Sequence, residues 1–149
     1  MKKRLLHILI AIVVVALLLG VATWLTLPAE EYHMLLHRNV FENIAYLDDD
    51  TEVKLPIEVM LADFRVENTT TDQKNDTIYT FSLLLQPTGN TAPEHITDIN
   101  LQPLQTETYR HYNIYIEEFI YNEAEGRLIV FLKLERLRYQ LLLNSLNIH

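Results

Sequence analysis

The segment VKLPIEVMLADFRVE, residues 53–67, decides the fold class of this chain. From Ile57 to Leu61 every second residue is a branched aliphatic one, which is the period of a β-strand with one buried face. The apolar pattern then continues in the opposite phase from Phe64, as if one extra residue stood near Ala62 and Asp63. Such an insertion is typical of a β-bulge, so the sequence predicts one long, bulged strand.

The next strand follows along the chain and predicts a pairing with the first. Apolar and polar residues alternate from Tyr79 to Leu85, and Pro87 and Gly89 then end the pattern. The polar, threonine-rich stretch Asn68–Asp76 between the two strands predicts a loop or a wide hairpin turn. We expect Phe64 and Phe81 to be buried on the two facing strands.

Further strands are predicted towards the C-terminus. The stretch His111–Phe119 is rich in aromatic and β-branched residues, and turn residues at Asn122–Gly126 connect it to an alternating strand at Leu128–Leu134. Between the two hairpins, Thr91–Thr108 predicts a short strand at Ile96–Ile99 followed by an irregular connection. The leucines that follow residue 136 have helical spacing, although they could also extend the last strand.

These elements predict a mainly β domain, built as an antiparallel β-sandwich or an open barrel-like sheet. The chain is predicted to divide into three regions: a transmembrane anchor at residues 1–27, a juxtamembrane helix and linker at 28–50, and an extracytoplasmic β-rich domain at 51–149. The helix is predicted because apolar residues of Ala29–Leu47 recur at steps of three and four, after Glu30 and Glu31 at its expected start. Asp48–Glu52 is predicted to connect this helix to the first strand.

The N-terminal segment has the composition of a membrane span. Three basic residues precede Leu5–Leu27, a run of 23 residues with no Lys, Arg, Asp or Glu, and about 34 Å of helix suffices to cross a bilayer core. A cleaved secretory signal is the alternative, with a small-x-small triplet at Gly20–Ala22 that would leave an N-terminus at Thr23. Either interpretation gives an N-in, C-out orientation, with the anchored form in the inner (cytoplasmic) membrane and its domain in the periplasm or outside.

Charge and cysteine content exclude several classes of function. The part beyond Pro28 carries nine Lys and Arg against 20 Asp and Glu, a formal charge of −11. Nucleic acid is therefore excluded as a partner, because its binding depends on cations that neutralise phosphates. The chain has no cysteine, so thiol chemistry is excluded and the domain depends on its apolar core rather than on disulfides.

Candidate functional residues are few, and the chain is expected not to be an enzyme because no known catalytic motif occurs in it. His33 and His37 would share one face of the predicted juxtamembrane helix and could contact one metal or one haem; surface histidines are the alternative. His7 lies just inside the apolar run, where an ionisable side chain suggests a function, or else at the headgroup interface. Several aromatic residues could line a ligand groove or pack on a strand face: Tyr109, Tyr112, Tyr115, Phe119 and Tyr121.

The chain resembles one known family on two stretches. Leu55–Glu67 is similar to the L-P-F-x-apolar-x-L-x-D-F-x-aliphatic-E strand of ResB-like cytochrome c biogenesis proteins. Ile99–Leu104, with Tyr109–Arg110 and Ile114–Tyr115, resembles that family's N-x-P-L and G-Y-R-I-Y-Q hairpin. The chain departs from the family in an extra residue within N-x-P-L, in Ile116 where the family has glutamine, and in lacking the family's additional spans.

This resemblance implies a function in cytochrome c maturation. The protein would be a membrane-anchored accessory subunit that handles haem or apocytochrome c, beside a CcsA-like multispan membrane protein. Haem would be transient cargo, with His7, His33 and His37 as its candidate ligands, since imidazole is a common axial ligand. The alternative is a membrane-tethered β domain that binds another envelope protein without any cofactor.

Overall fold

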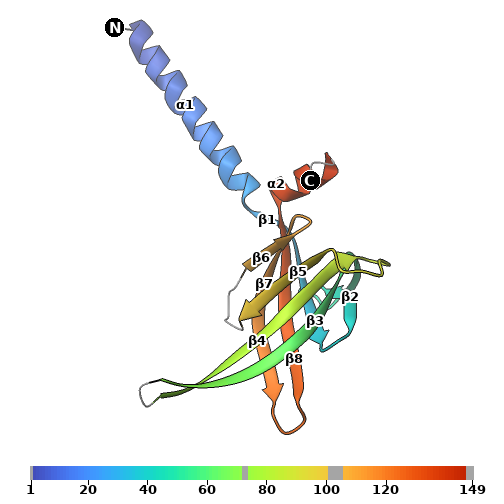
Figure 1. Cartoon of the computed structure of the whole chain (residues 1–149). Coiled ribbons are helices and arrows are strands. Elements are labelled where there is room, and N and C mark those ends of the chain that lie inside the picture. The colour runs from blue at the N-terminus through green and yellow to red at the C-terminus, as the bar shows by residue number, and fades with distance from the viewer. Residues whose placement is uncertain (1, 72–73, 101–105, 147–149) are drawn as a thin grey trace.

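The computed structural model describes residues 2–71, 74–100 and 106–146. One long helix precedes a set of β-strands, and a short helix follows them (Figure 1). In chain order the elements are α1 (Lys2–Leu25), β1 (Pro28–His37), β2 (Phe41–Tyr46), β3 (Glu52–Thr71), β4 (Lys74–Pro87), β5 (His95–Asn100), β6 (Thr106–Tyr109), β7 (Tyr112–Asn122), β8 (Arg127–Leu137) and α2 (Arg138–Ser145).

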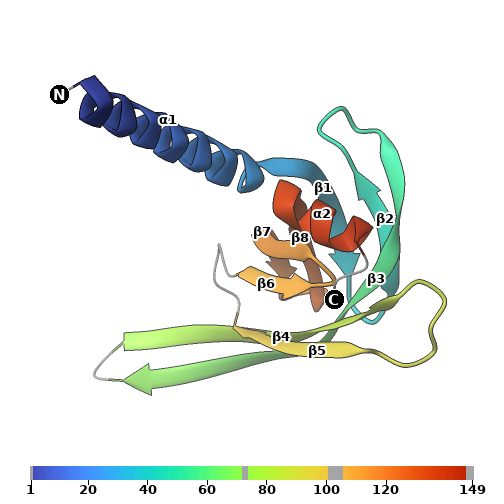
Figure 2. The ribbon, with the colours of Figure 1, turned by 90° about the horizontal axis from the view of Figure 1, so that it is seen from above.

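The strands form one antiparallel sheet in the order β5-β4-β3-β2-β1-β8-β7-β6. The sheet curls on itself into a nearly closed barrel behind α1 (Figures 1 and 2). No strand pairing joins β5 to β6 in the part of the chain that the structure describes, so these two strands border a seam. The predicted fold class, an antiparallel open barrel-like sheet, is confirmed.

The strand at residues 53–67 has the predicted bulge. Leu55, Ile57 and Leu61 of β3 are buried, and the pairing with β4 shifts between Ala62 and Arg65. The shift inserts one residue, which turns the following aromatic side chain to the inner face. The prediction made from the change of apolar phase is therefore confirmed.

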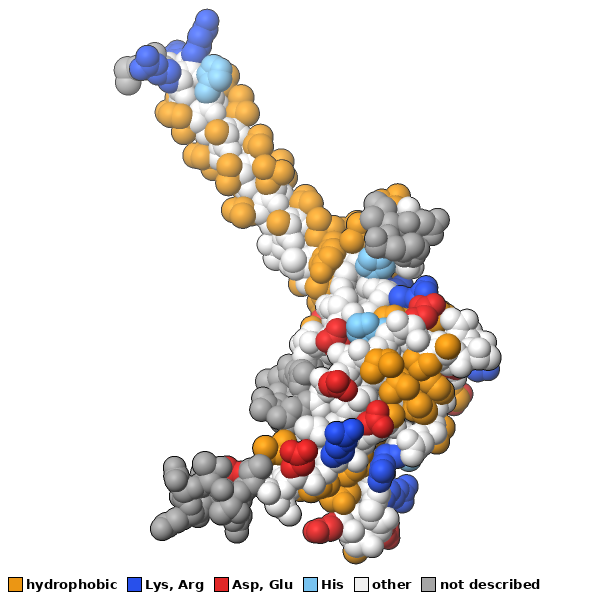
Figure 3. Space-filling view, viewed as in Figure 1, with side chains coloured by type: hydrophobic (Ala, Val, Ile, Leu, Met, Phe, Trp, Pro, Cys, Tyr) orange, Lys and Arg blue, Asp and Glu red, His pale blue; other side chains and the backbone are white. Residues whose placement is uncertain are grey.

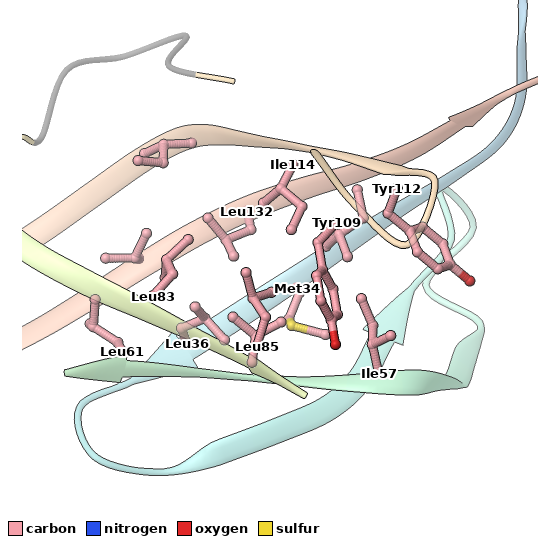
Figure 4. Close-up of a cluster of buried hydrophobic side chains, with 14 of the residues drawn as sticks. Met34, Leu36, Ile57, Leu61, Leu83, Leu85, Tyr109, Tyr112, Ile114 and Leu132 are labelled. Carbon is pink, nitrogen blue, oxygen red and sulfur yellow. The ribbon is translucent and has the colours of Figure 1, made fainter. Parts of the chain in front are cut away.

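The barrel interior is filled mainly by aliphatic side chains, together with Phe81 and two tyrosines. Figure 4 shows side chains from β1, β3, β4, β6, β7 and β8 pointing towards one another. The largest fully enclosed ones include Met34, Leu36, Leu83 and Leu132. At about 25 cal/mol for each Å² of apolar surface buried, this core is the main stabilising contribution in a chain without disulfides.

The prediction of a juxtamembrane helix at Ala29–Leu47 is wrong, because β1 and β2 occupy that region. β1 pairs with β8 from Pro28 to His37, so it joins the two halves of the sheet. Its buried residues Met34 and Leu36 are two apart, as in a strand. The helical spacing was a weak local preference, and the long pairing with β8 overrides it.

The prediction of a loop at Asn68–Asp76 is also wrong over its described residues. β3 continues to Thr71 and β4 begins at Lys74, and the pairing extends to these two residues. Threonine is β-branched and suits a pleated strand. We call residues 66–71 and 74–79 the arm, because they form a two-stranded ribbon that projects beyond the barrel (Figures 1 and 2).

The second hairpin, the short strand and the C-terminal helix are confirmed, whereas the irregular connection predicted to extend to Thr108 is wrong at its end, because β6 begins at Thr106 and pairs with β7. β7 and β8 form the second hairpin, β5 matches the short strand at Ile96–Ile99, and α2 is a helix rather than an extension of β8. Residues 101–105 of the predicted irregular connection, with part of the second resemblance motif, lie outside the described residues. Phe81 is buried as expected, whereas Phe64 is only half-buried.

α1 has 24 residues and none of them is buried. It is long and apolar enough to cross a membrane. Figure 3 shows apolar side chains along the whole helix, with Lys and Arg gathered at its free end. Only Thr26 and Leu27 separate α1 from β1, so the barrel lies directly beside the end of the helix.

Candidate functional site

Four aromatic side chains gather at the end of the barrel that lies opposite α1. Phe64 and Tyr79 stack with ring centroids 6.3 Å apart, and Tyr121 meets the edge of Phe64 at 5.0 Å. Tyr79 also contacts Phe119 at 5.7 Å. All four side chains are partly buried. We call Phe64, Tyr79, Phe119 and Tyr121 the aromatic mouth.

Two bulges place these rings. The first, in β3, brings Phe64 to the inner face. The second lies in β7, where the pairing with β8 shifts between Ile116 and Glu118. Beyond this shift, Phe119 faces the same side of the sheet as Ile116. The two residues are three positions apart, so in a regular strand they would face opposite sides. The aromatic cluster in the predicted strand was visible in the sequence, but this second bulge was missed.

A cation lies against the aromatic mouth. The guanidinium of Arg38 is 5.4 Å from the centroid of the Phe64 ring, and its Nη1 donates a hydrogen bond of 3.2 Å to the carbonyl of Gly126. Aromatic rings with an adjacent arginine bind planar and apolar side chains well. Because the mouth is partly open, it can accept such groups from a partner.

The arm continues from the aromatic mouth, and in the described part of the chain no third strand pairs with either of its edges. β2 pairs with β3 no further than Met60, and β5 pairs with β4 only from Thr80 to Leu85. Beyond these points the described strands of the arm pair only with each other. Open edges of this kind accept an added strand from another polypeptide.

The structure places His33 on β1 between two carboxylates. Its Nε2 lies 2.9 Å from Asp48 Oδ1 and its Nδ1 lies 3.1 Å from Glu117 Oε2. Burial alone lowers the pKa of His33, but the hydrogen bonds that its ring makes to Glu117 and Asp48 outweigh burial, and the pKa is raised above the ordinary value. A doubly protonated imidazole donates from both nitrogens and has no lone pair left to bind iron.

The three predicted histidines do not form a common site. His33 and His37 share a face of β1, but four residues of a strand span about 13 Å, so one metal cannot bind both, and the expectation based on a helix is wrong. His37 lies 3.6 Å from Glu42, whereas His7 Nδ1 is 2.5 Å from the carbonyl of Lys3 within α1. Across the described residues, no group of three or more His, Asp or Glu side chains could hold a metal ion.

Polar side chains close the seam between β5 and β6. Glu94 accepts hydrogen bonds of 2.6 Å from Arg110 Nη2 and 2.8 Å from the Tyr109 hydroxyl. The hydrogen bonds from Arg110 and Tyr109 lower the pKa of Glu94. His95 stacks on Tyr109, and a cavity of about 570 Å³ lies beside them. No pattern in the sequence indicates this cluster, since Glu94 and Arg110 meet only through the closure of the barrel.

The predicted tyrosines are divided between the two faces of the sheet. Tyr109 and Tyr112 lie in the core, and Tyr121 belongs to the aromatic mouth. Tyr115 is on the outer face, where its hydroxyl is 2.5 Å from Glu135 Oε1. This hydrogen bond, with burial, raises the pKa of Tyr115 to about 12. The tyrosines therefore do not line one groove.

The fold and site together define a class of protein: an apolar N-terminal helix that carries a nearly closed antiparallel β-barrel with an aromatic mouth and a projecting arm. No protein-family model, curated protein or solved structure matches this chain.

Proposed function

We propose that this protein is a membrane-anchored, non-enzymatic subunit that binds an extended segment of another envelope protein at the aromatic mouth and the arm. The observation that carries the proposal is the arm, whose open strand edges begin directly beside the four aromatic rings. A segment added to either edge would form backbone hydrogen bonds along the arm. Its apolar side chains would contact the mouth.

In this proposal α1 spans the inner (cytoplasmic) membrane once. Lys2, Lys3 and Arg4 remain on the cytoplasmic side, as the positive-inside tendency favours. The barrel then lies in the periplasm or outside the cell. The arm and the aromatic mouth are at the end of the barrel remote from α1 (Figure 1), which supports binding of partners away from the bilayer surface.

The resemblance to ResB-like proteins narrows the choice of partner proteins. Under this proposal the protein is an accessory subunit in cytochrome c maturation, the partner at the arm is apocytochrome c, and a CcsA-like multispan protein contacts α1. The motif that supports it, Leu55–Glu67, supplies core residues of β3 and Phe64 of the aromatic mouth. Haem would be passing cargo rather than a resident cofactor.

The side chains described here favour peptide binding over direct ligation of haem by His33. Both nitrogens of His33 are held by carboxylates, and His37 has Glu42 beside it. His7 is separated from both by most of the length of α1. These contacts favour the second candidate function, binding of an envelope protein without any cofactor.

A deletion strain assayed for covalently haem-stained cytochromes c tests the maturation role. We expect staining to be lost and to return with the wild-type gene. Normal staining in the deletion strain would exclude the maturation role and leave the cofactor-free function. Complementation by His7→Ala, and by the paired His33→Ala and His37→Ala variant, would show that these histidines are not required.

A second comparison tests the site itself. Phe119→Ala removes one ring of the aromatic mouth, whereas Ile120→Ala alters the next residue of β7, which points away and is exposed. We expect the first variant to weaken capture of the partner segment and the second to retain it, with both proteins present in membranes at equal levels. Equal capture by the two variants would contradict the assignment of the mouth.

A further inference from the structure

α2 exposes one apolar face. Tyr139, Leu142 and the C-cap residue Leu146 are spaced at three and four residues, so they lie on the same side of the helix. Their exposed fractions are 39%, 47% and 66%. The opposite side faces the barrel, where the buried Gln140 donates to Asn113 Oδ1 at 2.8 Å. The orientation of α2 on the barrel is therefore fixed, and Leu142 and Leu146 point outward.

α2 is attached to the end of α1. The backbone N–H of Arg138 donates to the carbonyl of Leu27 at 3.1 Å, and the guanidinium of Arg138 lies 4.6 Å from the centroid of the Trp24 ring. Trp24 is itself about half exposed, at 48%. In Figure 1 the short helix lies beside the end of α1 with its axis running across that of the long helix. The exposed leucines are thus level with the end of the apolar segment.

The charge around α2 differs from that of the rest of the domain. The chain has 20 acidic residues, but none follows Glu135. Arg138, the first residue of α2, precedes the exposed leucines, whereas Arg136 is buried on β8 and pairs with Glu30. A helix with an apolar face, an arginine at its start and a neighbouring tryptophan matches the headgroup region of a bilayer, where a cation meets phosphates and indole rings are favoured.

We propose that α2 is an interfacial helix, which lies in the headgroup region of the same bilayer that α1 spans. The inference rests on the membrane span of the proposed function. The occupant is lipid rather than protein because the exposed face continues the apolar surface of α1 through Trp24 and Leu27. The barrel then has two attachments to the membrane, and its tilt is fixed so that the arm is held away from the lipid.

The absence of cysteine allows a direct test. The full chain carrying Leu142→Cys is labelled with a polarity-sensitive fluorophore and placed in vesicles of phosphatidylethanolamine and phosphatidylglycerol. Lipids with quenchers at different depths then locate the label, which we expect about 5–10 Å below the headgroup surface. Ile120→Cys is the matched control, because Ile120 is 51% exposed on β7 and should report water.

A second variant separates lipid contact from contact with protein. A label at Tyr139→Cys should move from lipid to water when Leu142→Glu and Leu146→Glu are introduced, while α1 keeps the protein in the vesicles. A label at residue 142 that reports water in protein that floats with vesicles would overturn the interfacial helix and leave the anchor intact. Protein that fails to float would overturn both the anchor and this inference.

Discussion

At the scale of single residues, the bulge of β3 depends on an unusual backbone conformation at Asp63. Asp63 has φ of 52°, in the left-handed region, and its side chain is exposed. That region costs an L-residue about 1–2 kcal/mol, and glycine is free of the cost. The conformation of Asp63 turns Phe64 towards the other three rings of the aromatic mouth.

The free energy of unfolding of variants at position 63 should therefore depend on how readily the new residue adopts a positive φ. We expect Asp63→Gly to leave the free energy of unfolding within about 1 kcal/mol of wild type, and Asp63→Val to lower it by about 1–2 kcal/mol or more. Denaturant unfolding in detergent measures both. At the neighbouring Ala62, which has an ordinary strand conformation, valine should be tolerated better than glycine. The same order at both positions would contradict the argument.

The pH dependence of His33 follows from its raised pKa. Since the folded pKa lies above the unfolded value of about 6.5, protonation stabilises the folded state. The stabilisation is fully present below the unfolded pKa and is lost as pH rises through the folded pKa.

Unfolding measured from acid to alkaline pH checks this prediction. Relative to His33→Asn, wild-type protein should lose stability as pH rises above about 6.5. The side chain is 36% exposed, so solvent screening keeps the effect small. His37→Asn serves as the control, and an identical pH profile for wild type and His33→Asn would refute the ion pairs with Asp48 and Glu117.

At the scale of elements, two bulged strands, β3 and β7, bring aromatic rings to one end of the barrel. Each bulge changes the phase of its strand, so that the aromatic residues beyond it, Phe64 on β3 and Phe119 and Tyr121 on β7, turn towards the mouth. Phe81 and Phe64 show the difference, since the first is 2% exposed and the second is half-buried.

Truncation of these two rings should differ accordingly. Phe81→Ala should lower the free energy of unfolding by about 3–5 kcal/mol, because it leaves a cavity in the core. Phe64→Ala should cost roughly half as much, since solvent already reaches the ring. Denaturant titration of both variants measures the difference. Equal losses would show that the mouth is as closed as the core.

The arm, which we propose binds a partner, is expected to add little stability. Its strands pair with each other, and among the apolar side chains that the structure describes in it, Tyr79 packs against the buried core at the base of the arm. An isolated two-stranded ribbon is marginally stable. Replacing residues 67–78 with a short turn should change the free energy of unfolding by less than about 1 kcal/mol but should abolish capture of the partner segment. Loss of the folded barrel in this variant would contradict the separation of the two roles.

At the scale of the whole molecule, α1 is long and apolar enough to span a membrane, and the proposed function requires that it is retained. If α1 is retained, the mature protein should begin at or next to Met1 and resist extraction by carbonate. Sequencing of the N-terminus from the membrane fraction checks this. A soluble protein that begins at Thr23 would instead show that the segment is a cleaved signal, in which case Trp24 and Arg138 would still be present but the span would be lost.

The sequence by itself determined the elements whose patterns are local. The alternation at Ile57–Leu61, its change of phase before Phe64 and the uncharged run Leu5–Leu27 predicted the bulged strand and the apolar helix. Each of these is a property of neighbouring residues, because burial on one face selects a period of two and a bilayer selects length and composition.

Only the tertiary structure decided the features that join distant segments. β1 is a strand because β8 lies beside it, and the arm extends because β3 and β4 continue to pair. Glu94 meets Arg110 across the seam, and His33 lies between Asp48 and Glu117. These contacts depend on the curl and register of the whole sheet, which no period within a single segment encodes.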